Sequence, residues 1–233
     1  MITYVILFDI DGTLVSSSMA EDDERRRYTY AIRDVVGKEP SVVPSRFAGM
    51  VDPQICRILL AETGLAEQEV QHFLPKVIVR MGEIYRGMEK KLVLNNGVGE
   101  LLRILAGSPH HVLGVLTGNL SAVGNEKLAV AGIKSFFSRG FFADAYFDRN
   151  RLMEEAIDAC VADYQLPSRK NVMIVGDTPR DIAAANAANA TSIGIASGVY
   201  SASQLSQEGA TWVFPDLTPS KELLSALAVR RLC

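Results

Sequence analysis

One stretch near the start of the chain, YVILFDIDGTL at residues 4–14, constrains the fold more than any other. Five apolar or aromatic residues run without interruption and end at Asp9. Such a run is typical of a strand that is buried on both faces, as in a parallel sheet. Asp9 and Asp11 lie two residues apart, so an extended backbone points both carboxylates the same way. Because ligands bind beyond the carboxyl ends of parallel strands, the stretch predicts a functional site there.

Two neighbouring carboxylates repel each other, and a divalent cation commonly offsets that repulsion. Mg²⁺ prefers one or two carboxylates together with waters and a substrate phosphate, which makes Asp9 and Asp11 candidate ligands. An Asp-x-Asp pair on a surface loop is usually only a solvated turn. Here the pair follows a buried-strand pattern and precedes Gly12 and Thr13, a far rarer arrangement that favours a metal site.

The composition argues against several classes of protein. With 233 residues the chain can form one large or two modest domains, and a net charge of −3 gives no basic surface for nucleic acid or an anionic membrane. No apolar run approaches the roughly 20 residues that span a bilayer, and a strand beginning at residue 4 leaves no room for a secretory signal. Cys56, Cys160 and Cys233 are far apart, which argues against a zinc site or a disulfide framework. We expect a cytoplasmic protein with reduced thiols.

The hydrophobic pattern divides the chain into a helical part and an alternating part. Helices are predicted at residues 19–36, 52–64 and 67–86, with Asp52 as the N-cap of the second and Pro75 bending or interrupting the third. From residue 91 onward, helices alternate with strands that are predicted at residues 112–116, 140–143, 171–175, 191–195 and 212–214. This alternation indicates an α/β fold with a doubly wound parallel sheet, a Rossmann-like core.

The helical part interrupts the alternating part after its first strand. We therefore expect an α/β core domain at residues 1–15 and 91–233, and an all-helical cap domain at residues 16–90. The two connections between them, near residues 15–18 and 90–94, are the expected hinges.

Polar residues follow two further predicted strands. The sequence TGN at residues 117–119 offers a hydroxyl, a flexible glycine and the free N–H groups of the next helix, which together suit an anion. Asp177 ends a later strand, and Asp181 lies four residues on, facing the same way if a helix has begun. Taken alone, these are also an ordinary strand-to-helix turn and a first-turn acid. Their coincidence with Asp9 and Asp11 at converging strand ends indicates a single site.

These stretches together resemble the motifs of a known family. DIDGTL at residues 9–14, TGN at 117–119 and GDTPRD at 176–181 look like three of the four signature motifs of the haloacid dehalogenase-like hydrolase superfamily. The spacing and the early helical insertion are similar to its phosphoglycolate phosphatase-like branch. The resemblance covers the whole chain and implies a Mg²⁺-dependent enzyme acting on a small phosphorylated metabolite. It leaves the oligomeric state open.

The resemblance implies a role for each matching acid. Asp9 would attack phosphorus and form an aspartyl-phosphate. Asp11 would protonate the leaving oxygen and then activate the water that hydrolyses the intermediate. Mg²⁺ would be held by Asp9, by the backbone carbonyl of Asp11 and by Asp177, whereas Asp181 would bind it through water or orient its ligands.

The phosphate-binding residues include one departure from the family pattern. Thr117 and the amide of Gly118 would hold phosphate oxygens, and Asn119 belongs to the same substrate-binding turn. The third motif usually carries a Lys, and none stands at the corresponding place here. Arg149 aligns best as its replacement and Arg151 is the runner-up, although Arg is not an equivalent point charge. A solvated loop arginine is the alternative interpretation.

The choice among the superfamily's reactions depends mainly on Asp11. A dehalogenase needs no acid at that position and no Mg²⁺, so the sequence favours a phosphatase. A sugar-phosphate mutase shares every core residue and stays open, as does a non-catalytic relative that binds phosphate compounds or a partner. The cap should decide the substrate, and Arg46 is a candidate for binding an acidic substrate group, although a surface arginine is equally compatible.

Overall fold

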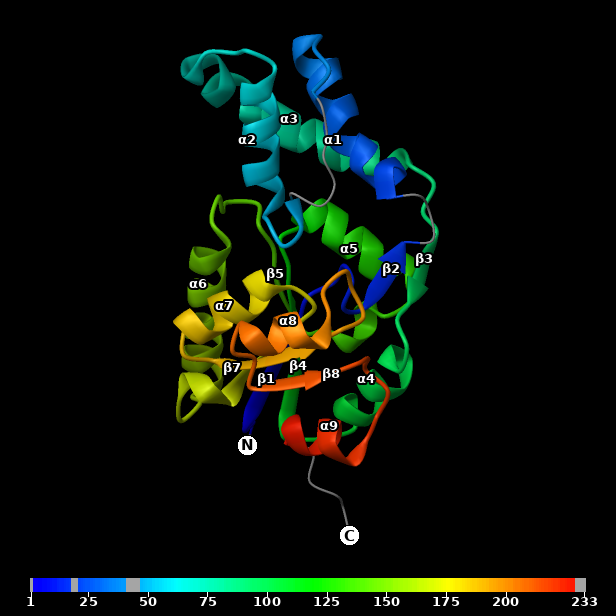
Figure 1. Ribbon diagram of the computed structural model, residues 1–233, viewed down its shortest axis with the longest axis vertical. Helices are drawn as coiled ribbons and strands as arrows, with labels where there is room; N and C mark the ends of the chain where they lie inside the picture. Colours follow the sequence, from blue (N-terminus) through cyan, green and yellow to red (C-terminus); the bar gives the residue numbers. More distant parts are fainter. Residues whose placement is uncertain (1, 18–20, 41–46, 229–233) are drawn as a thin grey trace.

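The computed structural model describes residues 2–17, 21–40 and 47–228, and Figure 1 shows a sheet with helices on both faces below a group of three helices. The main sheet has six strands in the order β5-β4-β1-β6-β7-β8, and every neighbouring pair is parallel. Its strands are β1 (Tyr4–Phe8), β4 (His111–Leu116), β5 (Arg139–Phe141), β6 (Val172–Gly176), β7 (Thr191–Ile195) and β8 (Trp212–Phe214). The predicted parallel α/β fold is confirmed.

Strand β1 lies in the middle of this sheet, between β4 and β6. Its side chains alternate between two separate cores: Val5 and Leu7 pack on one face, and Ile6 and Phe8 pack on the other. All four are fully buried, which explains why the strand is an unbroken apolar run rather than an alternating one.

Helices cover both faces of the sheet. One face packs against α4 and α9, and the other against α6 and α7. The helices of this part are α4 (Val98–Ala106), α5 (Ser121–Val130), α6 (Arg149–Tyr164), α7 (Pro179–Ala187), α8 (Ala202–Gln207) and α9 (Lys221–Ala226), with short 3₁₀ turns at Lys134–Phe136 and Arg169–Asn171. Asn189 takes the left-handed conformation after α7, with φ 57°, a role that asparagine can fill where glycine is absent.

The remaining helices, α1 (Glu21–Val36), α2 (Asp52–Glu62) and α3 (Glu67–Gly87), lie together at one end of the molecule (Figure 1). They share an apolar cluster that also takes in Leu120 and Val123, which lie at the start of α5. Helix α3 continues through Pro75, so of the two predicted effects the interruption was wrong and the bend stays a prediction. Among the described residues, no helix is both long and apolar enough to cross a membrane.

The two connections to these helices pair with each other. Strand β2 (Val15–Ser17) leads out of the sheet and β3 (Leu92–Leu94) leads back, and they form an antiparallel two-stranded ribbon. Asn95, directly after β3, donates from Nδ2 to the carbonyl of Gly12 at 2.7 Å, and Ser197 Oγ donates to the same carbonyl at 2.7 Å. The ribbon is therefore anchored at the turn that follows Asp9. The division of the chain into core and cap domains stays a prediction.

Candidate active site

The carboxyl ends of β1, β4 and β6 meet at a cavity of about 460 Å³ that also touches α1 and α2. Eight residues predicted from the sequence lie in or beside it: Asp9, Asp11, Thr117, Gly118, Asn119, Arg149, Asp177 and Asp181. Arg46 lies outside the described residues. Arg151 is on the surface, with 76% of its side chain exposed, and pairs with Glu155.

Three buried carboxylates form the acidic centre of the site. Asp9 follows β1, Asp177 follows β6 and Asp181 lies in the first turn of α7, and each offers an oxygen within 4.8 Å of the other two. Asp181 accepts hydrogen bonds from the Thr178 backbone N–H at 3.1 Å and hydroxyl at 2.7 Å, in a capping box that fixes its side chain.

Two glycines close over the Asp177 carboxylate. A Cβ atom built on Gly12, whose φ is +79°, would lie 2.3 Å from Asp177 Oδ2, and one built on Gly198 would lie 1.8 Å from the same atom. Only glycine therefore allows the loops after β1 and β7 to approach so closely. Asp177 accepts a hydrogen bond from the Thr13 hydroxyl at 3.1 Å, and no cation in the described part of the chain pairs with it.

Packing these acids together changes their proton affinities. Burial raises the pKa of Asp9 from 3.8 to about 7, Arg149 opposes the rise, and the Asp181 and Asp11 carboxylates add to it. Burial also raises the pKa of Asp177 well above its usual value, with further contributions from Asp9 and Asp181. Without a cation, the folded protein therefore resists carrying all of these charges.

This electrostatic conflict predicts a pH-dependent difference in stability between the metal-free protein and its Asp9→Asn variant. A carboxyl whose pKa is raised on folding destabilises the native state above that pKa, and the penalty disappears as the pH falls toward the unfolded value. Because the introduced asparagine does not titrate, the advantage of the variant should shrink as the pH falls from 7 to 5, by up to about 1.4 kcal/mol per pH unit. Urea unfolding of both proteins in EDTA, at several pH values, measures the difference in their free energies of unfolding. A difference that is independent of pH would contradict the raised pKa of Asp9.

Arg149 supplies a positive charge to the acidic centre. It lies at the start of α6 with 7% of its side chain exposed, and its Nη2 lies 3.3 Å from Asp9 Oδ1 and also donates to Asp181 Oδ1. Its Nε is buried and has no hydrogen-bond partner among the described residues. Of the two arginines weighed from the sequence, Arg149 is therefore the one in the site.

Asp11 is separate from the three-carboxylate cluster, because its side chain turns toward α5. Asn119 Nδ2 donates to Asp11 Oδ2 at 2.6 Å, and Lys127 Nζ donates to Asp11 Oδ1 at 2.6 Å. The partial burial of Asp11 in the cavity would by itself raise its pKa, but the Lys127 ammonium and these hydrogen bonds outweigh that effect and lower the pKa. The two carboxylates that the sequence places together are thus held in different environments.

The turn at residues 117–119 is fixed by its own side chains and by the helices above it. Asn119 donates to the buried Thr117 hydroxyl through Nδ2 at 2.9 Å. Gly118 accepts a hydrogen bond at its carbonyl from the Asp52 N–H at 2.7 Å, and a Cβ on Gly118 would lie 2.4 Å from the Met50 carbonyl oxygen. The absence of a side chain at Gly118 therefore allows the segment before α2 to contact this turn.

Sequence reasoning missed a second buried charge cluster beside the cavity. Asp52 is not the N-cap of α2, a position that Val51 takes. The Asp52 carboxylate instead accepts hydrogen bonds from Tyr28 OH at 2.5 Å, Arg27 Nη2 at 3.3 Å and the Leu120 N–H at 2.9 Å. The cluster therefore joins α1 and α2 to the start of α5.

Lys127 was missed for a different reason. It lies on the same face of α5 as the buried Val123. A lysine at a helical position where the pattern expects an apolar residue is the feature that could have indicated a buried, paired lysine. Its side chain is only 1% exposed, and a lysine is almost never buried to that degree unless it is paired.

The donor set fits Mg²⁺. The three clustered carboxylates are hard oxygen ligands, and Mg²⁺ prefers such ligands. Asp177 is the clearest indication, because it is buried, has a raised pKa and lacks a cationic partner among the described residues. A divalent cation bound there would offset the repulsion among Asp9, Asp177 and Asp181.

Comparison with known proteins identifies the family. The model of haloacid dehalogenase-like hydrolases matches residues 4–189. No curated protein sequence matches the chain at a significant level. Among solved structures, a predicted phosphoglycolate phosphatase from Haemophilus somnus 129PT is 23% identical over 93% of this chain and 95% of its own, with a TM-score of 0.68.

Two further structures share the fold. A putative phosphatase from Clostridium difficile is 18% identical over 97% of this chain and 99% of its own, with a TM-score of 0.64. A β-phosphoglucomutase from the same organism is 15% identical over 98% of both chains, with a TM-score of 0.70. The family match covers most of the chain, and the fold agrees with it. The chain therefore belongs to the haloacid dehalogenase-like hydrolases, as its motifs predict.

Proposed function

We propose that this hydrolase is a Mg²⁺-dependent phosphatase that acts on a small phosphorylated metabolite through an aspartyl-phosphate on Asp9. The observation that carries the proposal is the arrangement of the acids. Asp9 belongs to a buried cluster that fits Mg²⁺, whereas Asp11, two residues on, is held apart from it by Asn119 and Lys127. One carboxylate is thereby available for attack and the other for proton transfer.

In the first step an Asp9 carboxylate oxygen bonds to phosphorus and the bond from phosphorus to the ester oxygen breaks. The negative charge of the bound phosphate favours a proton on Asp11 in spite of Lys127, and Asp11 gives that proton to the departing oxygen. In the second step Asp11 accepts a proton from water, which attacks the same phosphorus, and Asp9 is released together with inorganic phosphate. Asp11 is protonated again at the end, ready for the next substrate.

The other residues bind charge and hold groups in place. Arg149 lies against Asp9 and carries a charge that suits phosphate oxygens, and Thr117 with the amide of Gly118 would hold the remaining oxygens. Mg²⁺, bound by Asp9, the Asp11 carbonyl and Asp177 with support from Asp181, would neutralise charge on the transferring phosphoryl group.

The substrate is proposed to be small because the cavity is about 460 Å³ and is partly closed by the helical insertion. Its walls combine charged groups of α1 with the apolar Phe47 and Ile55. We propose that residues 16–90 form a cap domain that excludes bulk water when it covers the site.

Hydrolysis of a chromogenic aryl phosphate, with and without EDTA, tests this function. We expect turnover that EDTA abolishes and added Mg²⁺ restores, because the three clustered acids need a cation to bind a phosphate dianion. A panel of phosphorylated metabolites should then yield inorganic phosphate from at least one compound. Conversion of a sugar phosphate to its isomer without phosphate release would instead establish the mutase, and the absence of any metal-dependent turnover would favour a non-catalytic role.

A further inference from the structure

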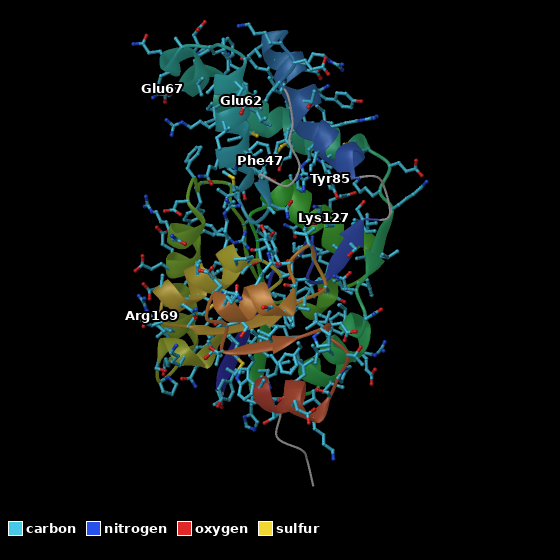
Figure 2. All side chains as sticks on the ribbon, viewed as in Figure 1. Phe47, Glu62, Glu67, Tyr85, Lys127 and Arg169 are labelled. Carbon is cyan, nitrogen blue, oxygen red and sulfur yellow. The ribbon has the colours of Figure 1, made fainter. Side chains whose placement is uncertain are left out.

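Lys127 is a buried cation that the proposed mechanism does not yet use. It lies on α5, where its Nζ is 2.6 Å from Asp11 Oδ1 and 5.7 Å from the centre of the Tyr85 ring. Figure 2 shows Lys127 and Tyr85 near each other, where the three upper helices meet the α/β core. Tyr85 belongs to α3, so Lys127 contacts the helical insertion and the site together.

The Asp11 carboxylate needs hydrogen-bond donors such as Lys127 to hold it in a single orientation. Its side chain is 44% exposed, so surrounding residues alone do not restrain it. It is held instead by two hydrogen bonds of 2.6 Å, one to each oxygen, from Lys127 and Asn119. With donors on both oxygens, rotation of the carboxylate breaks at least one bond.

Lys127 itself is well suited to this task. A buried ammonium is stable only when it is paired, and Lys127 forms an ion pair with the Asp11 carboxylate. The adjacent acid on the same helix, Glu126, pairs with Lys90 at 3.4 Å instead. The Tyr85 ring lies beside both ammonium groups, at 5.2 Å from Lys90 Nζ and 5.7 Å from Lys127 Nζ.

We propose that Lys127 is a positioning residue for Asp11. Its ammonium, held between the Tyr85 ring and the carboxylate, fixes Asp11 where it can give a proton to the leaving oxygen and accept one from the attacking water. The inference rests on the proposed phosphatase function. Because a misplaced proton donor slows only the steps that need it, removing Lys127 should affect substrates unequally. An alkyl ester needs a proton on its leaving oxygen, whereas a nitrophenolate leaves without one.

Lys127→Met tests the inference, since methionine fills similar space without a charge. With an alkyl phosphate, kcat should fall about 10- to 100-fold with little change in KM. With p-nitrophenyl phosphate, the first turnover should stay fast and be followed by a slower steady state, because only hydrolysis of the intermediate still needs Asp11. Lys127→Gln, which keeps a donor, should recover part of the loss.

Lys90→Met is the matched control, because it removes the other ammonium beside Tyr85 but touches no part of Asp11. Because Lys90 lies at an expected hinge, any loss of rate in this control should be the same for the two esters. Equal losses in Lys90→Met and Lys127→Met, or an equal loss of first-turnover rate on both esters in Lys127→Met, would overturn the proposal. So would a crystal structure of Lys127→Met in which the Asp11 carboxylate keeps its place.

The two hypotheses fail in different ways. A wild-type protein that hydrolyses neither ester, or does so equally well as Asp9→Asn, would refute the phosphatase. An active wild type that loses activity in Asp9→Asn but not in Lys127→Met would refute only the role of Lys127.

Discussion

Replacing Asp9 with asparagine should abolish phosphate release, with a loss of at least about 10⁴-fold in kcat. Asparagine has nearly the shape of aspartate and can still accept a hydrogen bond from Arg149, so the site should keep its geometry. It has no anionic oxygen to attack phosphorus, so the aspartyl-phosphate cannot form. Steady-state release of p-nitrophenol measures the loss.

The same variant separates a lost nucleophile from a lost fold. Metal-free Asp9→Asn should unfold at higher urea than wild type at pH 8, since a buried charge with its pKa raised to about 7 has been removed. An acid-quenched reaction of the wild type should contain phosphorylated protein, and one of the variant should not. If Asp9→Asn turned over at a rate comparable with wild type, Asp9 would not be the nucleophile.

Replacing Arg149 with alanine should lower kcat by about 10²- to 10³-fold and also weaken the fold. The change leaves Asp9 and Asp181 without their shared guanidinium, and stranding buried charge in this way typically costs about 3–5 kcal/mol. Arg149→Lys should lose less activity and less stability than Arg149→Ala, because it restores a positive charge. It should still fall short of the wild type, because a single ammonium cannot contact both carboxylates as a guanidinium does. Urea unfolding and aryl phosphate hydrolysis, measured on both variants, test the two effects.

Arg151→Ala is the matched control for this experiment. The two arginines lie in the first turn of the same helix, yet Arg151 extends into solvent and pairs with Glu155. We expect no measurable change in kcat or in the unfolding midpoint of Arg151→Ala. Should that variant lose as much activity as Arg149→Ala, the assignment of the site cation to Arg149 would be wrong.

The sheet and most of the site could be predicted because both depend on local signals. An unbroken apolar run such as Tyr4–Phe8 indicates a strand buried on both faces, and a parallel sheet brings the residues after such strands to one edge. Asp9, Thr117 and Asp177 follow directly from that rule. The cation of the site could be narrowed to Arg149 or Arg151, but only the position of the start of α6 decides which of the two faces the acids.

The contacts made by Lys127 and Asp52 could not be predicted, because they depend on how separate elements pack. Lys127 is 116 residues from Asp11 in the sequence, and no sequence pattern predicts that an α5 side chain contacts the turn after β1. Asp52 has the sequence context of a helix cap, and tertiary packing overrides that preference because Tyr28, Arg27 and the Leu120 N–H compete for its carboxylate. Buried polar pairs between distant elements need the fold itself.

The ribbon of β2 and β3 makes the helical insertion easy to lengthen or exchange. Because the chain leaves and re-enters the core through paired strands, the two covalent connections of the segment between residues 17 and 92 lie side by side. Lengthening or exchanging that segment alters one closed loop, whose entropic cost grows only slowly with its length. If the insertion selects the substrate, as proposed, we expect its replacement to change specificity while the anchored turn at Gly12 keeps Asp9 and Asp177 in place. We expect chimaeras joined at the ribbon to fold more readily than chimaeras joined within a helix.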